Sequence, residues 1–151
     1  MRIQREVREP QTIVGMHEVV SMSGLSEFFG RAFEAVAAEL ARLGAAPAGP
    51  PVALYRGPFT DTVDVVAGFP VPRAVQPGSG LVAETLPGGS LVETIHSGAY
   101  DALSKTYDEL SEWFVQQGPT PAEEMWEEYL VGPPRETDPS RWQTRIVLPV
   151  A

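Results

Sequence analysis

The stretch GLSEFFGRAFEAVAAELARLGAAPAGPPVALY, residues 24–55, decides the fold, because a later stretch of the chain repeats its pattern. Residues 98–129, GAYDALSKTYDELSEWFVQQGPTPAEEMWEEY, align with it from end to end without a gap. After the shared first glycine, the identical pairs are Gly44 and Gly118, Pro47 and Pro121, Ala48 and Ala122, and Tyr55 and Tyr129. The same residues in the same order indicate an internal duplication.

Each of the two stretches is predicted to begin with a helix. Apolar residues recur three and four positions apart over residues 25–43 and again over residues 103–114, which places them on one helix face. Gly44 and Gly118 follow these runs at the position where glycine commonly ends a helix.

Segments rich in β-branched residues surround both helices and predict strands. One precedes each helix, at residues 12–21 and 90–97, and two follow each helix, at residues 51–55 and 63–71 and at residues 125–131 and 142–150. A further short strand, at residues 5–9 or 81–86, ends at Pro10 or at residues 87–89.

The order of these elements predicts the α+β class, with two strand-helix-strand-strand units related by pseudo-twofold symmetry. We expect one shared antiparallel sheet with both helices on one face. The chain is interpreted as a single domain over residues 1–151, with a first repeat at about 1–72 and a second at about 80–151. Residues 72–80 form the Pro/Gly-rich connector between them.

The duplication also resolves residues 122–130, AEEMWEEYL, whose composition favours a helix. Their counterpart in the first repeat is AGPPVALYR, where Gly-Pro-Pro excludes a helix and Val-Ala-Leu-Tyr is typical of a strand. On a strand, Glu127 and Tyr129 share one face. Because the equivalent residues are Ala53 and Tyr55, the helix-covered face is expected to carry one carboxylate without a counterpart.

The other face of this strand would carry Trp126 and Glu128. For Trp126 two interpretations stay open, burial against the body of the protein or contact with a second copy in a homodimer. Glu123, Glu124 and Glu128 are interpreted as solvated charges, with a protein contact as the alternative.

Composition and charge restrict the classes of function. Eleven basic and twenty acidic residues give a net charge of −9, which argues against direct binding of nucleic acid. The absence of Cys and the separation of His17 from His96 argue against a metal site, and no motif indicates a cofactor. No stretch approaches about 20 apolar residues, so we expect no membrane span and a cytoplasmic protein.

An unpaired carboxylate in an apolar site costs several kcal/mol of desolvation unless it is compensated, so Glu127 is the principal functional candidate. Aromatic faces and a carboxylate together suit a flat, hydrophobic cation. For the polar aromatic residues, packing in the core and lining a ligand site both stay open, whereas Phe28, Phe33 and positions such as Leu103 are expected in the core. The candidate ligand-binding residues are Glu127, Tyr129, Tyr55, Tyr100, Phe59, Trp142, Tyr107, Trp113 and His96, the last with a structural role as its alternative.

The run ETIHSGAYDALSKTYDELSEWFVQQG, followed by EEYL and a terminal IVLPV, resembles the GyrI-like domains, which also serve as effector-binding domains of multidrug-sensing transcription activators. The matching residues are His96, Gly98 and Tyr100 before the helix, Glu127 and Tyr129 on the strand, and Leu148–Pro149–Val150 at the end. The resemblance implies a ligand cleft between the two helices for amphipathic, often cationic aromatic compounds. It also implies that Glu127 is the anionic anchor, with Tyr129 beside it.

The resemblance leaves three functions to weigh. The first is a stand-alone multidrug-binding protein for sequestration or sensing, since the domain fills the chain without a helix-turn-helix segment. The second is a hydrolase of electrophilic, cyclopropane-bearing genotoxins, in which Glu127 activates water and Tyr129 or another tyrosine hydroxyl donates to the leaving oxygen. The third is a protein that modulates gyrase through its acidic surface.

Overall fold

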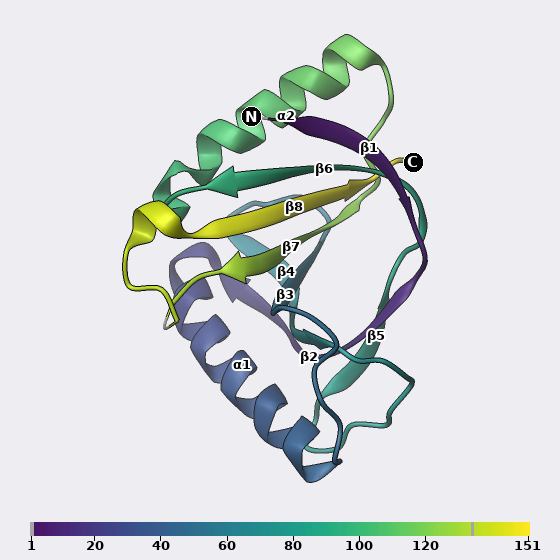
Figure 1. Cartoon of the computed structure of the whole chain (residues 1–151), viewed down its shortest axis with the longest axis vertical. Coiled ribbons are helices and arrows are strands. Elements are labelled where there is room, and N and C mark those ends of the chain that lie inside the picture. The colour runs from purple at the N-terminus through teal and green to yellow at the C-terminus, as the bar shows by residue number, and fades with distance from the viewer. Residues whose placement is uncertain (1, 134) are drawn as a thin grey trace.

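An eight-stranded antiparallel sheet with two long helices on one face forms the computed structural model, which describes residues 2–133 and 135–151 (Figure 1). The predicted α+β class and both helix positions are confirmed. The helices are α1 (Leu25–Arg42) and α2 (Leu103–Gln117), and the single-turn 3-10 helices are η1 (Met22–Gly24), η2 (Tyr100–Ala102) and η3 (Pro139–Arg141). The strands are β1 (Ile3–Arg8), β2 (Gln11–Ser21), β3 (Val52–Arg56), β4 (Thr62–Pro70), β5 (Val82–Leu86), β6 (Gly89–Ser97), β7 (Glu124–Val131) and β8 (Gln143–Pro149).

Both helices end at the predicted glycines. Gly118 directly follows α2 and adopts a left-handed conformation with φ of 93°. Its amide donates a hydrogen bond to the Phe114 carbonyl at 3.0 Å, which ends the helix. One face of α1 is buried through Phe28, Ala32, Val36 and Leu40. Neither helix, in the part of the chain that the structure describes, is long and apolar enough to cross a membrane.

The strand order β1-β6-β8-β7-β3-β4-β2-β5 places β3 and β7, the equivalent strands of the two repeats, side by side at the centre. These two strands are antiparallel, and Ala53 lies directly opposite Glu127. Because these two residues are also equivalent in the repeat, the pseudo-twofold axis passes between them. An exact duplication would therefore bring two carboxylates together on this axis, and Ala53 relieves that repulsion.

The outer strands pair across the repeats. Strand β1 of the first repeat pairs with β6 of the second, and β5 of the second pairs with β2 of the first. The alignment continues from Arg8 opposite Gly89 to Gln11 opposite Leu86, so that residues 3–15 and 82–94 form one long, bent antiparallel ladder. At the bend, a Cβ on Gly88 would lie 2.6 Å from a ring carbon of Pro10. The ladder joins the two edges of the sheet and makes the sheet curl, as Figure 1 shows.

The curl encloses a second core on the face away from the helices. Trp126 lies in this core with 1% of its surface exposed, packed with Leu54 from β3 and Val147 from β8. Of the two interpretations left open for Trp126, the structure therefore shows burial against the body of the protein.

The expectation that Glu128 is a solvated charge is wrong. Only 7% of its surface is exposed, and its carboxylate accepts hydrogen bonds from the Trp126 indole at 2.9 Å, from Arg8 at 2.8 Å and from Arg145 at 2.7 Å. Both arginines also pair with Glu93. The sheet curl explains the difference, because it turns the outward face of β7 into an enclosed one. Glu124 pairs with Arg56 at 3.3 Å and Glu123 is exposed.

Candidate functional site

A cleft of about 1180 Å³ lies over the central strands, between α1 and the start of α2. Its volume would hold a drug-sized molecule, for which pockets typically measure ~300 to 1,000 Å³. The described residues that line it are Met22, Leu25, Ser26, Phe29, Gly30, Phe33, Pro47, Gly49, Pro50, Pro51, Tyr55, Phe59, Phe69, Tyr100, Leu103, Glu127, Tyr129, Leu130, Gly132, Pro133 and Arg135.

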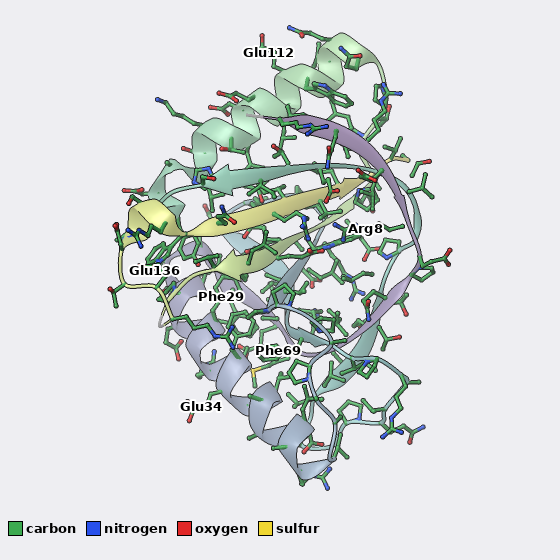
Figure 2. The ribbon with its side chains drawn as sticks, viewed as in Figure 1. Arg8, Phe29, Glu34, Phe69, Glu112 and Glu136 are labelled. Atoms are coloured by element: carbon green, nitrogen blue, oxygen red, sulfur yellow. The ribbon has the colours of Figure 1, made fainter. Side chains whose placement is uncertain are left out.

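Aromatic rings from both repeats form the walls around Tyr129. The ring centres of Phe29 and Tyr100 each lie 6.0 Å from that of Tyr129. Phe29 belongs to the first repeat and Tyr100 to the second. Phe33 adds an edge-to-face contact with Phe69 at 5.9 Å, and Phe29 and Phe69 lie between α1 and the sheet in Figure 2. Such rings offer both faces and edges to a flat ligand.

The Glu127 carboxylate lies at the floor of this cleft with 6% of the residue's surface exposed. Strand alternation places its side chain on the same face as Tyr129, whose hydroxyl donates to Glu127 Oε1 at 2.7 Å. The hydroxyl of Tyr107, from α2, donates to the other oxygen, Oε2. A carboxylate surrounded by neutral donors keeps its negative charge available to a ligand, since no cation of the described residues forms an ion pair with it.

Burial dominates the electrostatics of the site. It raises the pKa of the Glu127 carboxyl, and hydroxyl hydrogen bonds from Tyr107, Tyr129 and Tyr55 oppose this rise only in part. Burial and the nearby carboxylate together raise the pKa of Tyr55, Tyr107 and Tyr129, so these tyrosines stay neutral donors at neutral pH. The site can therefore attract a cation and can also hold a proton on its carboxylate.

Five of the nine residues predicted for the ligand site line the cleft. They are Glu127, Tyr129, Tyr55, Tyr100 and Phe59.

Two others lie directly behind the cleft wall. Tyr107 is the hydrogen-bond donor to Glu127 described above, and Trp142 packs on Tyr100 with ring centres 4.7 Å apart. Both side chains position residues that line the cleft.

The last two predicted residues, His96 and Trp113, lie away from the cleft. The His96 ring is buried between the Thr106 hydroxyl at 2.8 Å and the Ala99 carbonyl at 3.0 Å. Since a carbonyl only accepts, Nε2 carries a proton, and the ring connects the end of β6 with α2. Trp113 packs against Phe114 beneath Arg5.

Sequence reasoning missed several lining residues. Phe28 is fully buried as expected. Phe33 and Leu103, also expected in the core, line the cleft. Phe29 and Phe69 line it as well. One signal in the sequence was Gly30, a glycine inside a helix, where it weakens the helix. A Cβ at this position would meet nothing within 4 Å, so the glycine leaves open space along the cleft.

The side chains of the site suit an organic ligand. Aromatic rings provide stacking surfaces, and Glu127 provides one charge with two donor neighbours. Three or more His, Cys, Asp or Glu side chains arranged to hold a metal ion are not found among residues 2–133 and 135–151.

The sequence of the chain matches a known protein family. The sequence matches the family described as GyrI-like small molecule binding domain over residues 1–151. A search of the curated proteins found no match.

Solved structures share the fold at low sequence identity. The C-terminal domain of EcmrR is 19% identical with a TM-score of 0.86, and the match covers 99% of this chain and 97% of that one. SAV2435 bound to tetraphenylphosphonium is 15% identical with a TM-score of 0.71, covering 100% and 94%. A structure described as a hydrolase from Listeria innocua is 14% identical with a TM-score of 0.71, covering 99% and 92%.

Proposed function

Because the chain belongs to the family of GyrI-like small-molecule-binding domains, we propose that it binds hydrophobic, aromatic and mostly cationic compounds in the cleft, with Glu127 as the anionic anchor. The biological role of this binding is sequestration or sensing of such compounds. SAV2435, which shares the fold, is bound to tetraphenylphosphonium, a cation with four aromatic rings.

One observation carries this proposal. Among the described residues that line the cleft, Glu127 is the only carboxylate, and it is buried beneath rings from both repeats. A cation that replaces water at this carboxylate recovers part of the free energy that burial of the charge costs. Stacking and one charge require little directional matching, so chemically varied cations would fit the same cleft.

A cationic and a neutral ligand of similar shape should bind with different affinities. We expect tetraphenylphosphonium to bind at least about tenfold more tightly than tetraphenylmethane derivatives made soluble by neutral groups, because only the cation gains the charge interaction with Glu127. Isothermal titration calorimetry measures both affinities. Equal affinities for the cation and the neutral compound would contradict the proposal.

A second function uses the same carboxylate as a general base. The raised pKa of Glu127 and the Tyr129 hydroxyl beside it favour proton transfer at the cleft floor. Glu127 would take a proton from water as the water oxygen attacks an electrophilic cyclopropane carbon. The ring bond breaks, its electron pair moves to the conjugated oxygen, and that oxygen receives a proton from the Tyr129 hydroxyl, which in turn takes up the proton held by Glu127.

Mass spectrometry separates this hydrolysis from binding. Incubation with a cyclopropane-bearing electrophile would give a product heavier by one water, formed more than once per protein molecule. Recovery of the intact compound, or a single covalent adduct per site, would exclude the hydrolase and leave the binding function.

A further inference from the structure

The cleft contains a second charge, of the opposite sign to Glu127. Arg135 is the only basic residue among the described lining residues, and it lies in the segment between β7 and β8. The chain as a whole carries a net charge of −9, yet the charged side chains among the described lining residues are one carboxylate and one guanidinium. The cleft lining therefore carries balanced charges although the chain as a whole is acidic.

Arg135 also differs from most arginines of this chain in its contacts. Six arginines form ion pairs, namely Arg8, Arg31, Arg42, Arg56, Arg141 and Arg145. Within residues 2–133 and 135–151, no carboxylate pairs with the Arg135 guanidinium. The side chain is exposed, so its donors are available to a ligand at the mouth of the cleft.

Contacts on both sides of Arg135 hold its segment against the cleft wall. A Cβ on Gly132 would lie 2.8 Å from the Tyr100 hydroxyl, so the backbone there passes directly over Tyr100. The Glu136 amide donates to the Gly132 carbonyl at 3.1 Å, and the Glu136 carbonyl accepts from the Trp142 indole at 2.7 Å. Because Trp142 itself packs on Tyr100, this turn is fixed to the cleft wall. Figure 2 shows Glu136 on the same turn, at the end of the sheet near the start of α2.

We propose that Arg135 binds an anionic group of the ligand while Glu127 binds its cationic part, so that the preferred ligands are zwitterionic aromatic compounds. This inference rests on the proposed function and narrows its ligand class. A purely cationic ligand gains the interaction with Glu127 but meets an unfavourable charge at the mouth. A ligand with a carboxylate at its outer end gains both interactions, the second as a charge-assisted hydrogen bond.

A matched pair of dyes tests the inference. Rhodamine 110 carries a cationic xanthene ring and a free carboxylate, and rhodamine 123 is its methyl ester, with the same ring and no carboxylate. Fluorescence anisotropy gives the dissociation constant of each dye for the wild-type protein and for Arg135→Gln. We expect the affinity ratio of rhodamine 110 to rhodamine 123 to fall about three- to tenfold in Arg135→Gln, a moderate effect because the guanidinium is exposed.

Arg141→Gln is the control, because it removes the same charge from the same connecting segment at an exposed residue outside the cleft lining. It should leave the ratio unchanged. An equal change in both variants would show a long-range field and overturn the contact with Arg135, and an unchanged ratio in Arg135→Gln would overturn it as well. In either case, weaker binding of both dyes to Glu127→Gln would leave the proposed function standing. If neither dye binds the wild-type protein, the proposed function fails and this inference fails with it.

Discussion

Replacing Gly68 with alanine should lower the free energy of unfolding by about 3 kcal/mol or more, the largest effect on stability that we expect from a single added methyl group. A Cβ at this position would lie 1.9 Å from the Val14 carbonyl oxygen. Gly68 pairs with Gly15 of β2 on one side and with Val52 of β3 on the other, so the backbone has neighbours on both sides. Because the obstacle is backbone and not a flexible side chain, relief requires the strands themselves to shift.

Urea unfolding of the wild type and Gly68→Ala measures this difference. Gly30→Ala is the matched control, since the same methyl group meets nothing within 4 Å there and a helix interior favours alanine over glycine by up to about 1 kcal/mol. The control should be as stable as the wild type or more stable. A Gly68→Ala protein within about 1 kcal/mol of the wild type would show that the close approach of β2 and β4 is not required.

Replacing Glu127 with glutamine should weaken the binding of aromatic cations about 10- to 100-fold, as expected for the loss of a charge-assisted contact worth about 1.5 to 3 kcal/mol in a buried site. Neutral aromatic compounds of the same shape should bind within about twofold of the wild type, because the ring contacts stay in place. Calorimetric or fluorescence titration of both ligand types gives the two affinities. Equal cation affinity in the wild type and the variant would remove Glu127 as the anchor.

Glu123→Gln is the control for this experiment, because it changes the net charge equally at an exposed residue just before β7. Cation affinity should stay within about twofold in this variant. A loss as large as that in Glu127→Gln would assign the effect to the overall negative charge of the protein.

The pH dependence follows from the direction of the Glu127 shift. Its pKa in the folded protein lies above the ordinary value of 4.5, so the carboxylate takes up a proton at a higher pH than an exposed glutamate does. Cation affinity of the wild type should therefore fall as the pH is lowered through this raised pKa, whereas the affinity of Glu127→Gln should stay nearly constant. The free energy of unfolding changes in the opposite direction to the cation affinity and rises as the pH is lowered. The folded state gains from a protonated Glu127 and loses that gain as the pH rises, so Glu127→Gln should not be less stable than the wild type at pH 7.

Much of the fold and the central part of the candidate site could be predicted because, at each position, the equivalent residue in the other repeat gives a second indication of the local structure. For residues 122–130, propensity alone favours a helix, and the prolines of the first repeat overrule it. The strand then places Glu127 and Tyr129 on one face, and Ala53 identifies the carboxylate as unpaired in the repeat. Each of these steps uses local backbone geometry, which neighbouring residues largely determine.

Residues that depend on the path of the whole sheet could not be predicted in the same way. The sequence predicts a solvated charge at Glu128, because a regular sheet with helices on one face exposes its other face to solvent. Its actual partners are Arg8, from the far end of the chain, and Arg145, which lies directly opposite it on β8. Similarly, the spacing of apolar residues along a helix does not distinguish Phe33, which lines a cleft, from Phe28, which is buried in the core.

The sequence by itself determined the two repeats, their helices and strands, and the single unmatched carboxylate at Glu127, because periodicity, glycine and proline act over a few residues. Only the tertiary structure decided that β1 and β5 exchange between the repeats, that the sheet curls around Trp126, and that Arg135 lines the same cleft as Glu127. These features arise from contacts between segments far apart in the chain. Such contacts depend on sheet twist and strand pairing, which are fixed only when the whole sheet is assembled.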